Sequence, residues 1–309
     1  MNRWSISAPF SLARQPPCVG TSNPLALKGV AYAVFMQENR SIFKCEGLFM
    51  DVFPLWAFYF GAAVLGLELG GLSTIFIQRW IDELPILKPW RSRCPACETE
   101  LRLLDTIPLL SYLLLKGRCR HCDARIGGQY MVVEISCLAW ALASAHHFGP
   151  TVDWAVYLVL GVMLITGSFI DFETFLLPNR ITLGGAAIAL VACFFLEEPG
   201  WQDGILGAVV GAGLFWVLQQ GYRLWRKKEG MGTGDVKLML CIGAMVGFSG
   251  LPFTILAASA ASVVGMVIFM MRSDGDGLKT RIPFGPFLSL GCMLYLLYGE
   301  QAMRWYMSL

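Results

Sequence analysis

Charged residues are scarce in this chain. Of its 309 residues only 15% are Asp, Glu, Lys or Arg, whereas 56% are hydrophobic. Soluble globular domains contain about 25% charged residues, so this composition excludes an ordinary soluble protein. The apolar stretches are continuous and do not alternate with polar residues, which argues against a transmembrane β-barrel. The composition therefore predicts an all-α polytopic membrane protein.

Apolar runs of membrane-spanning length recur along the chain. A spanning helix needs about 20 mostly apolar residues. Eight segments meet or approach this length, and the sixth is short. They occupy residues 55–77, 130–148, 154–170, 181–196, 205–224, 236–248, 253–271 and 284–306. The sequence thus predicts about eight transmembrane helices embedded in a lipid bilayer.

Lys and Arg are missing from alternate loops. None occurs around residues 149–153, 197–203 and 249–252, where acidic residues collect instead. The remaining loops and segment ends contain the basic residues Arg79, Lys88, Arg91, Arg93, Arg102, Lys116, Arg118, Arg120, Arg125, Arg180, Arg223, Arg226, Lys227, Lys228, Lys237, Arg272, Lys279 and Arg281. Because cytoplasmic loops retain Lys and Arg, these ends are expected on the cytoplasmic side of the membrane.

The first 49 residues lack a tidy signal-peptide pattern. Their apolar run, residues 30–36, is short, and no convincing small-residue cleavage site follows it. The orientation scheme would also place their basic residues outside. Met50 opens a more ordinary membrane-protein start, MDVFPLWAFYFGAAVLG. Residues 1–49 are therefore expected to be an extension or a mis-assigned start without a function.

Two C-x-x-C pairs lie in the polar stretch between the first two apolar segments. They are Cys94-Pro-Ala-Cys97 and Cys119-Arg-His-Cys122. Four thiolates in this pattern form a tetrahedral zinc site, and small inserts rarely fold without such support. A cytoplasmic location argues against stable disulfides. The pattern predicts a structural zinc, since four sulfur ligands leave no position for a catalytic water; a redox pair or metal-free thiols are the alternatives.

Two aspartates lie where apolar segments end on the basic side. Asp171 ends one segment in GSFIDFETFLLPNRIT, where Pro178 interrupts the backbone, and Asp235 opens another in GMGTGDVKLM after Gly232 and Gly234. A carboxyl group at membrane depth is costly and marks a functional site. If the two adjoin, they cannot both ionise cheaply and would share a proton. We therefore predict a general acid and a general base acting on one water.

Other polar residues near these segment ends leave alternatives open. Each aspartate could instead cap a helix or pair with a local cation, Arg180 or Lys237. Lys237 is also expected to shape the site. Glu173 is a competing acid, and Glu134, near the start of the second span, is expected to have a structural or substrate-contact role.

Four motifs together resemble those of bacterial type IV prepilin peptidases, the leader peptidases and N-methyltransferases among the GxGD-type aspartic membrane proteases. The motifs are CPAC with CRHC, IDFETFLLPNRIT, GMGTGDVKL and IPFGPFL at residues 282–288. The resemblance covers residues 50–309. It implies cleavage of the leader of prepilins or pseudopilins at the cytoplasmic membrane face, followed by methylation of the new N-terminus with S-adenosylmethionine as donor. It also implies that Asp171 and Asp235 are catalytic and that Gly117, in LKGRC, belongs to the methyl-transfer region.

The resemblance divides the chain into a first transmembrane helix (50–78), a methyltransferase-associated four-Cys insert (79–129) and a peptidase core (130–309). Departures fall in the methyltransferase-associated part. Thr74 occupies the position of a usual Asn in GGLSTIFIQRWIDELP, and Met131 replaces a proline in YMVVE. No Rossmann-type glycine loop is visible to hold the methyl donor.

Two functions outside proteolysis stay open, a non-catalytic assembly factor and a proton-coupled transporter. Discontinuous helices with intramembrane carboxyls are also typical of transporters. Against a transporter, the two halves show no evident repeat, and the aspartates lie at the inner rim of the membrane. The expected partners are prepilins or pseudopilins and the lipid bilayer, with no nucleic acid.

Overall fold

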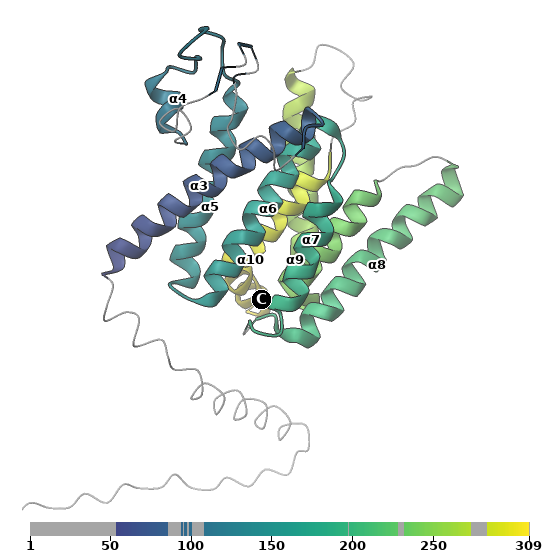
Figure 1. The fold of residues 1–309 in the computed structure, drawn as a ribbon. Helices are drawn as coiled ribbons and strands as arrows, with labels where there is room; N and C mark the ends of the chain where they lie inside the picture. Colours follow the sequence, from purple (N-terminus) through teal and green to yellow (C-terminus); the bar gives the residue numbers. More distant parts are fainter. Residues whose placement is uncertain are drawn as a thin grey trace, which may run out of the picture. The chain divides into compact units, whose positions relative to one another are not determined.

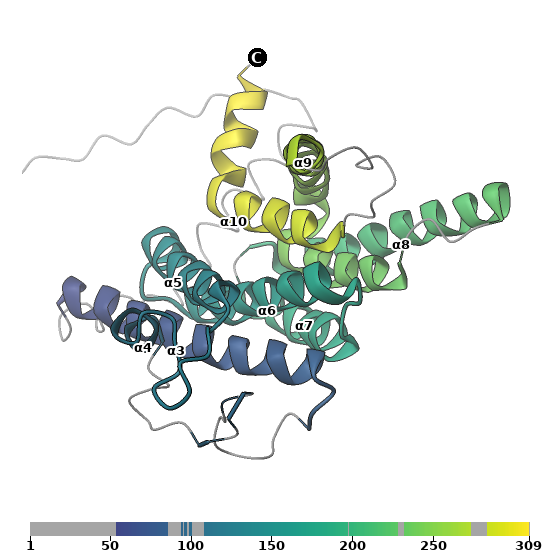
Figure 2. The same cartoon turned by 90° about the horizontal axis from the view of Figure 1, so that it is seen from above.

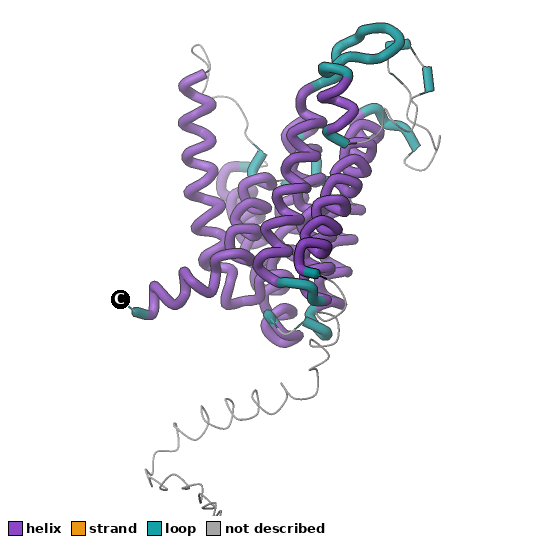
Figure 3. Tube along the Cα trace, turned by 90° about the vertical axis from the view of Figure 1, so that its left-hand side faces the viewer, coloured by secondary structure: helices purple, strands orange, loops and turns teal. Residues whose placement is uncertain are grey.

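The described part of the chain is built almost entirely from helices (Figures 1 and 3). A computed structural model describes residues 54–85, 94, 96–97, 99–100, 108–196, 198–227, 232–272 and 283–308. An isolated β-bridge joins Arg118 and Arg125. The expected extension, residues 1–49, lies outside the described residues.

Eight helices follow one another in the described residues. They are α3 (Leu55–Ile81), α4 (Leu110–Leu114), α5 (Gly128–Phe148), α6 (Val152–Thr174), α7 (Asn179–Ala192), α8 (Gly200–Arg226), α9 (Thr233–Arg272) and α10 (Gly285–Met307). Five of them, α3, α5, α6, α8 and α9, are long and apolar enough to cross a membrane. The predicted all-α membrane fold is confirmed.

Two of the predicted segments form two helices that meet at a kink and share the label α9. Segments 236–248 and 253–271 both fall in α9, where Gly247 (φ 70°, ψ 175°) interrupts the helical geometry. The prediction for 181–196 was four residues too long, because α7 ends at Ala192. Phe194 and Phe195 are apolar enough to extend the hydropathy signal, but turn-type hydrogen bonds replace the helical ones there.

Helix α6 lies at the centre of the bundle. Within its apolar stretch 67% of residues are buried, against 33% or less in the other membrane-length helices. Seen from above, α3, α5 and α7 surround it (Figure 2). Gly161 of α6 faces the Trp140 ring of α5, whose indole N–H donates to the Tyr157 carbonyl at 3.0 Å. The absence of a side chain at Gly161 allows this close approach.

The first half of α9 packs along α8, and contacts at Gly247 fix the end of this half. Gly207 of α8 and Gly243 of α9 meet backbone to backbone, with no room for a side chain at either position. At the kink, Gly247 lies against Asp203, near the start of α8, and the Ser249 hydroxyl donates to the Asp203 carboxylate at 3.0 Å. These contacts set the direction of the helix whose other end contains Asp235.

Candidate active site and cysteine cluster

Asp171 lies in the last turn of α6 and is buried. Its side chain is only 6% exposed, an unusual environment for a carboxyl group. The helix ends just beyond it, where Phe175 adopts a left-handed conformation and donates its N–H to the Asp171 carbonyl at 3.0 Å. This C-terminal cap and the loop after it stop the apolar helix at the predicted acid.

Asp235 lies in the first turn of α9 and is partly buried. Its backbone N–H donates to the Gly232 carbonyl at 3.3 Å, so the glycine-rich approach leads directly into the helix. The residue before Asp235, Gly234, packs against Leu177, which also packs against Gly285 next to Asp171. The fold therefore brings together the two acids that the sequence singled out, although they belong to different helices.

Gly285, the first residue of α10, lies directly against the Asp171 carboxyl. A Cβ built on Gly285 would be 2.6 Å from Asp171 Oδ2, so any side chain there would force a displacement. Asp171 Oδ2 is buried and forms no hydrogen bond with the described residues. The backbone amide of Gly285 lies close enough to interact with the carboxyl. Gly285 belongs to the motif IPFGPFL, but the sequence alone predicted no role for it.

Leu177, in the loop between α6 and α7, connects the three motifs of the site. A Cβ on Gly234 would be 3.0 Å from the Leu177 Cβ, and one on Gly285 would be 3.3 Å from its Cδ1. Leu177 thus packs against two glycines from distant parts of the chain. Pro178 is buried beside it and precedes the first residue of α7. Among the described residues, the atom nearest to a Cβ built on Gly232 is the Gly234 nitrogen, at 3.8 Å.

The cations that could have paired with the aspartates are engaged elsewhere or exposed. Lys237 Nζ donates to the Asn179 side-chain oxygen at 2.8 Å, and Arg180 is exposed. Among the described residues no ion pair involves Asp171 or Asp235. The alternative interpretation, in which local cations neutralise both acids, therefore has no contact to support it here.

Glu134, the third acid considered, makes a structural contact. Its Oε2 accepts a hydrogen bond from the Leu109 backbone N–H at 2.7 Å. Leu109 precedes α4 and has a positive φ of 57°. Glu134 therefore holds the turn before α4 against α5, which favours the structural role over the substrate contact. Glu173 is exposed to solvent.

The four predicted cysteines form one cluster. Their sulfur atoms all lie within 4.8 Å of one another, and Cys94 Sγ is 3.8 Å from Cys122 Sγ. Zn–S bonds of about 2.3 Å in a tetrahedron place the sulfurs roughly 3.8 Å apart. Hydrogen bonds with Thr99 lower the pKa of the Cys97 thiol to about 6, and backbone N–H groups of His121 and Cys122 lower that of Cys119. The cluster can therefore hold a metal ion.

Gly117 occupies a turn that only glycine adopts without strain. Its φ is +68°, and a built Cβ would be 2.9 Å from the Tyr112 ring. Its N–H donates to the Tyr112 carbonyl at 2.9 Å, and its carbonyl accepts from Ile126 at 2.8 Å. The geometry accounts for the glycine by backbone conformation. A role in methyl transfer stays a prediction.

Thr74, one of the two departures, is a buried residue of α3. Its hydroxyl donates to the Gly71 carbonyl at 2.7 Å and therefore bonds within its own helix. Met131, the other departure, lies in the first turn of α5 and is partly exposed. Neither residue contacts the aspartate site by any hydrogen bond among the described residues.

Fold and site together define a class of protein, a multi-pass helical membrane protein with two adjoining acids at helix ends. Comparison with known families then places the chain. A model of the type IV leader peptidase family matches residues 158–270, and one of the bacterial peptidase A24 N-terminal domain matches residues 64–148. The chain belongs to the type IV leader peptidase family. This confirms the resemblance seen in its motifs.

Relatives cover most of the chain. It is 33% identical to a prepilin leader peptidase/N-methyltransferase of Pseudomonas putida over 78% of this chain and 90% of the relative. Proteins of the same name are 35% identical in Aeromonas hydrophila (74% of this chain, 79% of the relative) and 37% identical in Pseudomonas aeruginosa (70% and 74%). No solved structure matches the chain significantly.

The two family matches divide the site residues. Glu134, Gly117 and the cysteine cluster fall within the N-terminal match, while Asp171 and Asp235 fall within the leader peptidase match. Gly285 lies beyond both. Family membership and five membrane-length helices identify a multi-pass inner-membrane protein.

Proposed function

We propose that this chain is an aspartic endopeptidase of the inner membrane that removes the leader peptide from type IV prepilins or pseudopilins. Asp171 and Asp235 are its catalytic pair. The observation that carries this proposal is the packing around Leu177. Leu177 contacts Gly234, the neighbour of Asp235, and also Gly285, which lies against the buried Asp171. Both acids lie at the ends of membrane-length helices. The names of the relatives supply the substrate class.

The paired carboxyls supply a complete proton cycle for peptide hydrolysis. One carboxylate is ionised and removes a proton from water as the water oxygen attacks the scissile carbonyl carbon. The other is protonated and donates to the carbonyl oxygen. When the tetrahedral intermediate collapses, the carbon–nitrogen bond breaks and the first carboxyl passes its new proton to the leaving nitrogen. The second carboxylate takes a proton back from a hydroxyl of the intermediate as the carbonyl re-forms, which restores the starting pair. Adjoining acids favour the singly protonated pair that this cycle needs.

The catalytic end of the bundle faces the cytoplasm in this proposal. Basic residues mark the same ends of other helices, as with Arg79 at the end of α3 and Arg226 at the end of α8. The first turn of α8, at its opposite end, contains the acidic Asp203. This asymmetry is the one that the positive-inside rule describes. A leader held in the cytoplasm would therefore reach both aspartates.

The relatives' name also supports a second activity, N-methylation of the new N-terminus. The amine released by cleavage would attack the methyl group of S-adenosylmethionine, forming a carbon–nitrogen bond, releasing the neutral thioether and losing a proton to solvent. Gly117 and the insert around it are the proposed region. Incubating the cleaved product with enzyme and donor should raise the product mass by one methyl group; an unchanged mass would limit the chain to proteolysis.

The cysteine cluster is proposed to hold a structural zinc through Cys94, Cys97, Cys119 and Cys122. Their spacing fits a closed tetrahedron, and the ion would stabilise an insert that has only the short helix α4 among its described residues. The residues at the cluster act by holding the turns before α5, and none of them is assigned to peptide cleavage.

The decisive experiment compares the purified wild-type protein with Asp171→Asn and Asp235→Asn on a prepilin-type substrate. Loss of either acid should reduce cleavage by roughly 1,000-fold or more, because both steps of proton transfer need the pair. Each variant should keep the wild-type metal content and unfolding temperature. Wild-type rates in either variant would defeat the paired-acid mechanism, and no cleavage by wild type would favour the transporter or assembly alternatives.

A further inference from the structure

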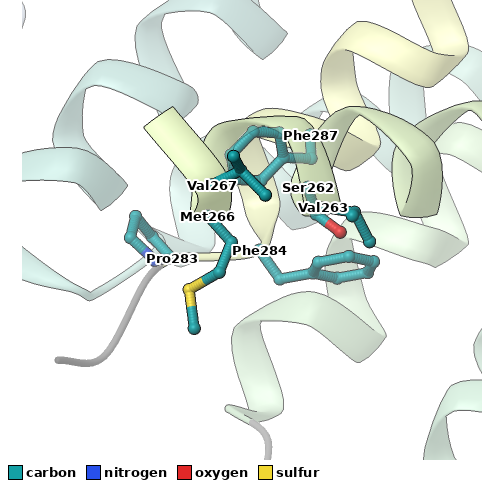
Figure 4. Close-up of a pocket in the computed structure, with 7 residues that line it drawn as sticks. All are labelled: Ser262, Val263, Met266, Val267, Pro283, Phe284 and Phe287. Atoms are coloured by element: carbon teal, nitrogen blue, oxygen red, sulfur yellow. The ribbon is translucent and has the colours of Figure 1, made fainter. Parts of the chain in front are cut away.

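An apolar groove of about 340 Å³ opens between the second half of α9 and the start of α10 (Figure 4). Its walls are formed by Val263, Met266 and Val267 of α9 and by Pro283, Phe284 and Phe287 next to them. Ser262, the one polar residue in the lining, already donates its hydroxyl to the Ser259 carbonyl at 2.8 Å. The groove therefore presents no unsatisfied polar side chain among its lining residues.

The groove is continuous with the aspartate site through the chain itself. Phe284 lines the groove, and the next residue, Gly285, lies against the Asp171 carboxyl. Neighbouring Cα atoms are about 3.8 Å apart, so this wall of the groove adjoins the residue that contacts Asp171. Phe284 also stacks on Phe215 of α8, and the Phe287 ring covers Gly265 of α9. These contacts make the groove wall a fixed part of the bundle.

The chemistry of the lining selects among possible occupants. Among the described residues that line this groove none is charged, so they offer an anionic lipid headgroup no cation. A second groove of about 300 Å³, between α3, α6 and α7, includes the exposed Arg180 and is better suited to a lipid phosphate. The uncharged groove fits apolar peptide side chains instead. A volume near 150 Å³ holds one benzene-sized group, so the α9–α10 groove can take about two large side chains.

We propose that the α9–α10 groove binds two large apolar side chains from the substrate's membrane segment, next to the bond that is cleaved. This inference rests on the proposed peptidase function and adds the element that selects the bond. A peptide backbone inside the bilayer must be helical to satisfy its hydrogen bonds. The two side chains would therefore lie three or four positions apart on one helix face. Seating them fixes the depth at which the leader junction meets Asp171 and Asp235.

Filling the groove tests this proposal. Val263→Trp places a large ring in the α9–α10 groove, and Val159→Trp does the same in the second groove. Both valines are partly exposed, so the two changes are chemically matched. With the full-length protein and a prepilin-type substrate, Val263→Trp should raise KM roughly tenfold while kcat stays within about twofold, because the lost burial of one large side chain weakens binding by this order. Val159→Trp should leave KM unchanged.

Changes in the substrate provide a second, independent measurement. Two apolar substrate residues at the predicted spacing after the scissile bond are replaced with serine. Wild type should lose about tenfold in kcat/KM, whereas Val263→Trp should lose little more, because the two changes remove the same contact. Additive losses would overturn the groove proposal, as would an unchanged KM in a folded Val263→Trp variant or an equal rise in Val159→Trp. If the wild-type protein cleaves the substrate, these results contradict the groove proposal but not the proposed peptidase function. If the wild-type protein does not cleave it, both the groove proposal and the proposed function are wrong.

Discussion

The aspartate site and the cysteine cluster are two ways of building a site in the same chain. The aspartate site is assembled from the ends of α6, α9 and α10, and glycines allow these ends to touch. The cysteine cluster is assembled from two short turns next to each other, with only α4 as a regular element among its described residues. The first depends on long-range packing of a membrane bundle, and the second depends on metal coordination. They should therefore fail independently.

The largest expected effect concerns the contact between α10 and Asp171. Gly285→Val should reduce kcat by about 100-fold or more, because its Cβ would meet Asp171 Oδ2 and displace the carboxyl. Metal content should not change. Gly213→Val on α8, where a Cβ has open space, is the matched control and should keep near wild-type activity. Equal activity of the two variants would show that the start of α10 does not set the position of Asp171.

The converse test removes the metal site. Cys119→Ser should abolish most bound zinc and expose the insert to limited proteolysis, because three ligands no longer close the tetrahedron. Peptide cleavage should fall by less than about tenfold, since the aspartates lie on helices outside the insert. Metal analysis and a cleavage assay on one preparation measure both effects. Zinc content equal to wild type would reject the four-thiolate site. A loss of cleavage as large as that in Asp171→Asn would show that the aspartate site depends on the cysteine cluster.

A smaller effect is expected where α5 meets α6. Gly161→Ala places a methyl group inside the Trp140 ring, and overpacking of this kind costs about 1–3 kcal/mol of stability. The unfolding temperature of the detergent-solubilised protein should fall, while KM stays unchanged at a permissive temperature. Gly221→Ala, in open space on α8, should not lower it. A stable Gly161→Ala variant would mean that the bundle repacks around α6 more readily than the contacts indicate.

The smallest effect concerns the hydrogen bond between Lys237 and Asn179. Lys237→Met removes a link between the starts of α9 and α7, which is worth about 0.5–1.5 kcal/mol at a partly exposed site. Cleavage should drop only a few-fold, and Asn179→Ala should give the same loss without adding to it in the double variant. A loss as large as that of Asp235→Asn would assign Lys237 a direct part in the chemistry.

Much of the fold could be predicted from the sequence because each helix is encoded by a continuous apolar run of its own. Every predicted segment falls within or directly beside a helix, and the cysteine cluster followed from two local spacings. The meeting of Asp171 and Asp235 was also predictable, since charge asymmetry put both at one membrane face. Gly285 and Leu177 could not be assigned in this way, because their contacts join segments that only the packed bundle brings together.

The two spans on either side of the kink were predicted, but their direct junction was not. Hydropathy dips near residues 249–252, which predicted a loop between the spans, whereas the two helices meet at Gly247. A positive φ at a glycine leaves no mark on hydropathy. Its reason is tertiary, because only a residue without a side chain fits against Asp203 at this point.

Gly247 makes the catalytic geometry sensitive to the far side of the membrane. The first half of α9 behaves as a rod of about 18 Å, with Asp235 at one end and the pivot at the other. With a rise of about 1.5 Å per residue setting this length, a tilt of about 5° at the pivot would move Asp235 by roughly 1.6 Å. A shift of this size is enough to separate it from its partner acid. The bond between Ser249 and Asp203 fixes that pivot. In the proposed mechanism, the alignment of the two acids thus depends in part on this hydrogen bond, which lies about 18 Å from Asp235 at the other end of the first half of α9.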